Sequence, residues 1–170
     1  MNEPHAKVWA HRLSLAAGPL IEIIALFLPY AVAKDMEYAT YVTDETGMNA
    51  INPSMVDFIR IYMSSDIEFV AGGQAYLTLG ITAAIGVFAL LAFLFAMLRK
   101  PIAAMVFDVM SMLAFALQNY DFSDRGVVPS DTFAWGWGMY LYVVAFILTV
   151  VCAIWTMIDR RRMRKQAAAA

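Results

Sequence analysis

The sequence predicts an all-α integral membrane protein, a four-transmembrane-helix bundle with a partly structured extracellular loop cap. Of its 170 residues 62% are apolar and 15% charged, whereas soluble domains are about half apolar and a quarter charged. The apolar residues gather in long stretches that are almost free of charge, and Lys and Arg collect on one side of them. We therefore expect a single membrane domain in contact with the lipid bilayer, and no nucleic-acid partner.

Four stretches are long enough to cross the hydrocarbon core as helices, which takes about 20 mostly apolar residues. They run over residues 13–33, 74–98, 101–118 and 136–158. The first could also be a signal peptide, since Ala31-Val32-Ala33 resembles a cleavage site. Its length and the central Glu22 favour a span instead.

The basic residues predict the orientation of the spans. Nine lie on one side, namely Lys7, Arg12, Arg99, Lys100, Arg160, Arg161, Arg162, Arg164 and Lys165, and three on the other, namely Lys34, Arg60 and Arg125. Short Lys/Arg-rich loops and termini stay cytoplasmic, so we expect a multi-pass plasma-membrane protein with both termini in the cytoplasm. Ten acids lie on the outer side, so a net charge of −2 conceals a strongly polarised molecule.

The two external loops, 34–73 and 119–135, are long enough to form a cap. Alternating residues over 38–43 predict a strand. Asn52-Pro53 predicts the start of a helix, whose apolar residues are helically spaced: Met55, Val56, Phe58, Ile59, Tyr62 and Met63. This helix could lie on the outer leaflet or pack over the spans.

Residues 119–124 superficially resemble a calcium loop, but they lack its glycine and its final glutamate. An ordinary solvated turn is favoured there. Trp135, Trp137 and Tyr140 are predicted to anchor the fourth span in the outer headgroups. Arg160, Arg161 and Arg162 are predicted to face the inner leaflet.

Small residues predict where the spans pack against other helices. Gly80 and Ala84 define such a face on the second span, and Ser14 and Gly18 on the first.

Glu22 and Asp108 are acids inside spans, where a charge costs about 2.5 to 3.5 kcal/mol. They lie nine and seven residues into spans of the same direction, a depth difference of about 3 Å. No span contains Lys, Arg or His, so we expect at least one acid to be protonated. The pair could serve a proton or cation path, or bind a basic residue of another subunit. It could also be structural, hydrogen-bonded to Ser111 and Thr149.

Nothing in the sequence predicts catalysis or a cofactor. The single cysteine, Cys152, excludes an internal disulfide and a multi-thiolate metal site. We find no nucleophile–base constellation, phosphate loop or metal-ligand spacing. We therefore expect a protein that is not an enzyme and that carries no cofactor or metal.

The layout of four spans and a long first external loop resembles that of claudins and tetraspanins. The W…GLW…C…C pattern of claudins and the CCG motif of tetraspanins are absent, so no family is assigned. Glu22 in the first of four spans is also similar to small multidrug transporters, whose chains are shorter.

The first functional hypothesis is an accessory or scaffold subunit of a larger membrane complex, with other membrane subunits or further copies of the chain as partners. The alternative is a small proton- or cation-coupled transporter using Glu22 and Asp108. A second alternative is an adhesion or receptor-like tetraspan.

Overall fold

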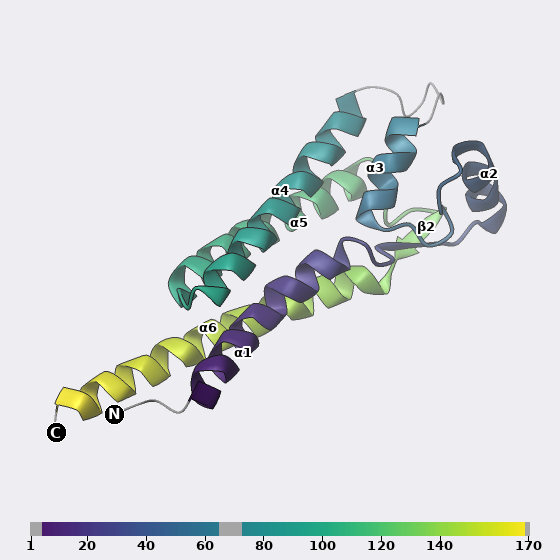
Figure 1. Ribbon diagram of the computed structural model, residues 1–170. Helices are drawn as coiled ribbons and strands as arrows, with labels where there is room; N and C mark the ends of the chain where they lie inside the picture. Colours follow the sequence, from purple (N-terminus) through teal and green to yellow (C-terminus); the bar gives the residue numbers. More distant parts are fainter. Residues whose placement is uncertain (1–4, 65–72, 169–170) are drawn as a thin grey trace.

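The computed structural model describes residues 5–64 and 73–168, and it is mostly helical. Within those ranges there are six helices and two short strands (Figure 1). In chain order these are α1 (His5–Ala25), β1 (Ala31–Ala33), α2 (Met36–Thr46), α3 (Met55–Ser64), α4 (Gly73–Met97), α5 (Pro101–Asp124), β2 (Phe133–Trp135) and α6 (Trp137–Ala168).

The long helices form two pairs, α4 with α5 and α1 with α6 (Figure 1). α4 and α5 are joined by a tight turn in which Arg99 has a left-handed φ of 59°. The amides of Arg99 and Lys100 donate to the carbonyls of Ala96 and Phe95, the pattern that closes a helix C-terminus. Pro101 then begins α5, where its missing N–H leaves no bond unmade.

α4 buries a stripe of mainly small side chains against its neighbours, at steps of three and four residues. The stripe consists of Ala75, Thr78, Thr82, Ile85, Ala89, Ala92 and Ala96. The expected face on Gly80 and Ala84 is therefore not the one that packs within the described part of the chain. Gly80 is exposed, and a Cβ built there would meet nothing within 4 Å.

Gly18 of α1, by contrast, lies in close contact with α6. A Cβ at this position would lie 2.1 Å from Thr149 Oγ1 and 2.7 Å from the carbonyl oxygen of Ala145. The absence of a side chain at Gly18 lets the two helix backbones approach closely.

Three helices within the described ranges are long and apolar enough to cross a membrane: α4, α5 and α6. The apolar part of α1, Leu13–Ala25, is shorter. The expected first span, 13–33, is wrong in its second half because the helix ends at Ala25 and residues 31–33 form β1. α5 corresponds to the third predicted span. It is longer than the expected 101–118 and continues to Asp124.

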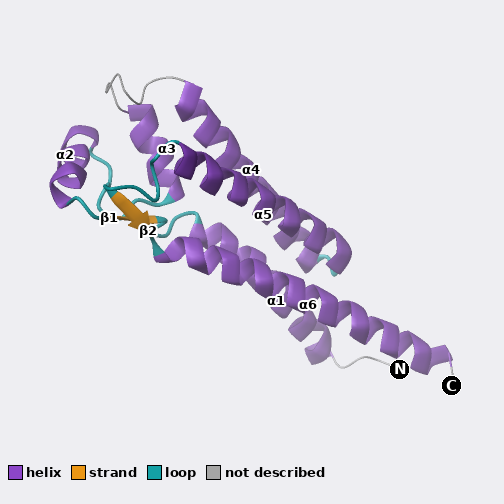
Figure 2. Cartoon of the chain, turned by 180° about the vertical axis from the view of Figure 1, so that it is seen from behind, coloured by secondary structure: helices purple, strands orange, loops and turns teal. Residues whose placement is uncertain are grey.

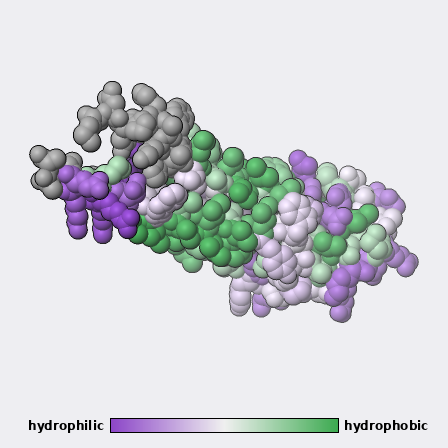
Figure 3. Space-filling model, turned by 90° about the horizontal axis from the view of Figure 1, so that it is seen from below, coloured by the Kyte–Doolittle hydropathy of each residue, from purple (hydrophilic) through white to green (hydrophobic). Residues whose placement is uncertain are grey.

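The surface has the pattern expected for a protein that lies in a bilayer. In Figure 3 a hydrophobic band covers the middle of the helices, with hydrophilic residues towards both ends. The basic end of α6 and the α4–α5 turn lie at one end, and the two strands with α2 lie at the other (Figure 1). We call the second end the cap.

The cap ties the end of α1 to the start of α6. β1 pairs antiparallel with β2, with Val32 opposite Ala134 (Figure 2). Gly136 and Gly138 donate their amides to the carbonyls of Tyr30 and Pro29. A Cβ on Gly136 would lie 2.3 Å from the Pro29 oxygen, so this approach requires glycine.

The predicted strand over 38–43 is wrong, since these residues lie in α2. Asp35 caps the helix by accepting a hydrogen bond from the Tyr38 amide at 3.0 Å. Gly47 ends it in the left-handed conformation. These two caps outweigh a six-residue alternation, which by itself also fits a helix.

The helix expected in the first external loop is present as α3, but it begins at Met55 rather than Pro53. Ser54 Oγ accepts from the Asp57 amide while Asp57 accepts from the Ser54 amide, which forms a capping box. Phe58 and Ile61 are buried. α3 thus packs over the long helices, which was the alternative to a helix lying on the outer leaflet.

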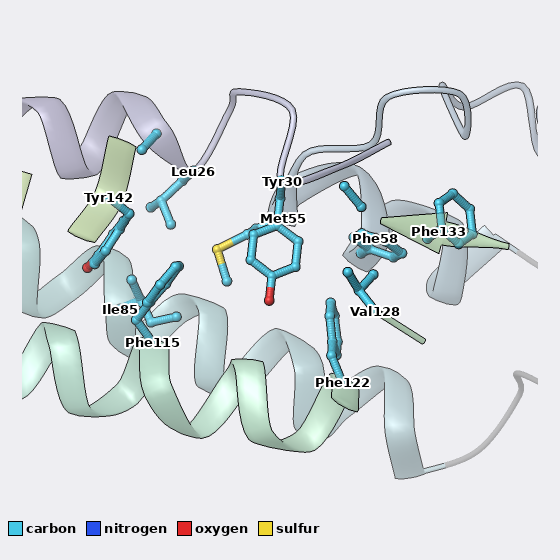
Figure 4. Packing of buried hydrophobic residues seen from close by; sticks show 12 residues of the cluster. Leu26, Tyr30, Met55, Phe58, Ile85, Phe115, Phe122, Val128, Phe133 and Tyr142 are labelled. Carbon is cyan, nitrogen blue, oxygen red and sulfur yellow. The ribbon is translucent and has the colours of Figure 1, made fainter. Parts of the chain in front are cut away.

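An aromatic core beneath the cap is centred on Tyr30 (Figure 4). Its ring makes edge contacts at 5.5 to 6.2 Å between centroids with Phe58, Phe115, Phe122 and Trp135. Its hydroxyl donates to Asn119 Oδ1 at 2.5 Å.

The segment that resembled a calcium loop belongs to the last turns of α5, so the expected turn at 119–124 is also wrong. Its Asp121 pairs with Arg125, one helical turn further along. Among the residues that the structure describes, no group of three or more His, Cys, Asp or Glu side chains could hold a metal ion.

Candidate functional site: a buried carboxyl pair

The two acids predicted to lie in the membrane, Glu22 and Asp108, meet near the axis of the helix bundle. α1 and α5 each pack against both α4 and α6, so they occupy diagonal positions. Glu22 reaches inward from α1 and Asp108 from α5, and both are 0% exposed. The two carboxyl groups are close enough to interact electrostatically. The arrangement brings one acid from each helix pair into a single site.

Helical periodicity aims both acids inward. The buried positions of α5 are Pro101, Ala104, Asp108, Ser111, Phe115, Gln118 and Phe122, again at steps of three and four residues. On α1, Leu15, Gly18, Glu22 and Ala25 form the corresponding stripe. Each acid therefore occupies a core position that an apolar residue would ordinarily fill.

Tyr142 of α6 and Ser111 of α5 lie beside Glu22. Ser111 Oγ is 2.6 Å from the Tyr142 hydroxyl and donates to the carbonyl of Ile85 at 3.0 Å. A serine hydroxyl has one hydrogen, so Tyr142 must donate to Ser111. With its hydrogen committed to Ser111, the Tyr142 oxygen can only accept a hydrogen bond from Glu22.

Thr149 of α6, which lies beside Asp108, is likewise left with acceptor capacity alone. Its hydroxyl donates to the carbonyl of Ala145 at 3.1 Å, which leaves only acceptor capacity towards the acid. A protonated carboxyl group is a donor and a carboxylate is not. The hydroxyls around the pair are thus suited to protonated acids.

The carboxyl groups nevertheless lack hydrogen-bond partners among the described residues. None of their four oxygens forms a hydrogen bond of ordinary geometry with any residue in the described ranges. No Lys, Arg or His occurs in the apolar helical segments around them. Buried polar side chains without a protein hydrogen-bond partner are uncommon.

The other residues singled out in the sequence lie apart from the pair. Trp135 is half-buried against Tyr30, whereas Trp137 and Tyr140 are exposed at the start of α6. Arg160 donates to the carbonyl of Arg99 at 2.8 Å. Arg161 and Arg162 are exposed on α6.

Two polar residues of the bundle interior were missed from the sequence. Tyr142 lies seven residues before Thr149, a spacing that places both side chains on one face of α6. Gln118 is 0% exposed, ten residues from Asp108 on the same stripe. The three-and-four spacing of polar residues on α5 was the signal that could have identified it.

No protein-family model matches the sequence, and no curated protein or solved structure is significantly similar to it. The acid pair is therefore interpreted from its own chemistry.

Proposed function

We propose that the protein is a four-span, proton-coupled membrane transporter in which Glu22 and Asp108 together bind the coupling proton. The observation that carries the proposal is the meeting of two fully buried carboxyl groups, one from each helix pair, with no cationic residue in the surrounding helical segments. Intramembrane acids that face a bundle interior commonly serve proton relays or ion paths.

The exposed face of α1 supports its role as the fourth span. Leu13, Leu20 and Ile24 share one helix face and are 44 to 61% exposed, as suits contact with lipid. The distribution of Lys and Arg favours cytoplasmic termini.

A proton at this site would change the force between the two helix pairs. When both acids are neutral, their carboxyl groups can share hydrogen bonds across the axis. When both are ionised, two like charges repel each other in a medium of low dielectric constant. The hydrogen bond between Ser111 of α5 and Tyr142 of α6, and the stacking of Tyr142 on Phe115, would then oppose separation there. Protonation can thus shift the balance between closed and opened arrangements of the pairs.

Proton flux into liposomes tests the proposal. Purified protein is reconstituted with a pH-sensitive dye inside, and uptake is driven by a potassium diffusion potential. Glu22→Gln and Asp108→Asn are each expected to abolish most of the flux. Glu37→Gln and Asp44→Asn, which alter exposed acids of α2, are the matched controls. Equal flux in all five proteins, or none in the unaltered protein, would contradict the proposal.

A role as an accessory subunit is the second candidate, favoured by the outward face of α4. Gly80 and Ala83 are exposed there, and nothing lies within 4 Å of a Cβ built on Gly80. Such a face permits close approach of another helix. Purification in mild detergent followed by mass spectrometry distinguishes the two roles, because a clean monomer without a partner would exclude the second.

A further inference from the structure

A basic pocket lies at the end of the molecule opposite the cap. It has a volume of about 610 Å³ and is formed by the α4–α5 turn, the first turn of α5 and α6. Its lining includes Arg99, Lys100, Arg160 and Arg161, and no acidic residue is among the residues that line it. Asp159, the one acid between residues 154 and 166, is not part of the lining.

A hydrogen bond from a side chain to the backbone holds the α4–α5 turn at the edge of the pocket. Arg160 donates from its guanidinium to the carbonyl of Arg99 at 2.8 Å, which fixes the turn against α6. Arg99 occupies the left-handed conformation, with φ 59°, in a position that glycine usually fills.

The start of α5 adds a second source of positive potential. Pro101, Ile102 and Ala103 line the pocket, and Lys100 provides no side-chain cap for the helix. The first amides of a helix have no partner within it, and they carry the positive end of its dipole. Basic side chains and uncapped amides that meet in one cavity are suited to a phosphate group.

Exposed apolar side chains next to the pocket point to a lipid as the source of the phosphate. Ile102 and Val106 of α5 are 64% and 49% exposed, and Ile154 and Ile158 of α6 are each 45% exposed. They lead from the pocket into the hydrophobic band. We propose that this pocket binds the phosphate headgroup of an anionic phospholipid, whose acyl chains lie along α5 and α6.

Native mass spectrometry of the full chain in detergent tests this site, with added phosphatidylglycerol or phosphatidylcholine carrying identical acyl chains. Lys100 and Arg161 are the residues to alter, because Arg99 and Arg160 also hold the turn against α6. The double variant Lys100→Gln and Arg161→Gln is expected to bind phosphatidylglycerol about 30-fold more weakly. Binding of phosphatidylcholine should be weaker from the start and little changed.

The matched control removes two positive charges from the same end of the molecule, both on α6 and outside this pocket. Arg162→Gln with Lys165→Gln should reduce the affinity for phosphatidylglycerol by less than about threefold. An equal loss in both double variants would show general attraction to a basic surface and would overturn the proposal. Displacement of the lipid by millimolar inorganic phosphate would assign the pocket to a soluble anion and would overturn the lipid assignment.

Discussion

The aromatic core beneath the cap and the acid pair are both buried, but they satisfy their polar atoms differently. In the aromatic core the Tyr30 hydroxyl donates to Asn119, and aromatic rings enclose it (Figure 4). In the acid pair four carboxyl oxygens lack ordinary hydrogen bonds to the described residues. The first arrangement favours stability. The second lowers stability, which is the pattern expected where polar groups serve function.

Removing the Tyr30 ring should have the largest effect on stability. Tyr30→Ala deletes four ring contacts and should lower the free energy of unfolding by about 3 to 5 kcal/mol. Thermal unfolding in detergent can be followed by a thiol-reactive dye, since Cys152 is buried. Tyr120→Ala is the control, because Tyr120 is 69% exposed. An equal loss of stability in both variants would contradict the assignment of Tyr30 to the centre of the aromatic core.

Gly18→Ala should have the next largest effect, because a Cβ there would overlap Thr149 and the backbone of α6. We expect a loss of about 1 to 3 kcal/mol, measured by the same dye. Gly80→Ala is the matched control and should stabilise the protein by up to about 1 kcal/mol, since the position is open. If the two variants behaved alike, the described packing of α1 on α6 would be contradicted.

Neutralising the acid pair should change stability little. The amide of Glu22→Gln offers the N–H donor that suits the acceptor capacity of Tyr142, and Asp108→Asn offers the same towards Thr149. Each variant is expected to unfold within about 1 kcal/mol of the unaltered protein. A loss above about 3 kcal/mol in either would indicate a structural partner for the carboxyl group and would remove the contrast with the aromatic core.

The smallest effect concerns Tyr62 of α3. Burial raises the pKa of its hydroxyl to about 12, with Asp121 and Tyr38 adding to the rise and Arg125 opposing it. The unfolded chain ionises this group near pH 10, so its contribution is present below that pH and is lost between about 10 and 12. Tyr62→Phe should weaken the pH dependence of unfolding in that window. An unchanged profile would contradict the assigned burial.

The long helices could be predicted from the local sequence because hydropathy and helix-ending residues determine them. The short connection between α4 and α5 is implied by the predicted spans 74–98 and 101–118, which leave only Arg99 and Lys100 between them. The similar depth of Glu22 and Asp108 followed from counting residues. The strand over 38–43 was wrong because alternation was given more weight than the caps at Asp35 and Gly47, and both caps were visible in the sequence.

The sequence by itself determined the membrane class, the long apolar helices and the two buried acids, because hydropathy and helical periodicity are properties of neighbouring residues. Only the tertiary structure decided that α1 stops at Ala25 and that residues 31–33 pair with a strand about 100 positions later. It likewise brought Tyr142 beside Glu22. Such contacts depend on how distant segments pack once the bundle closes, and the local sequence pattern does not predict that packing.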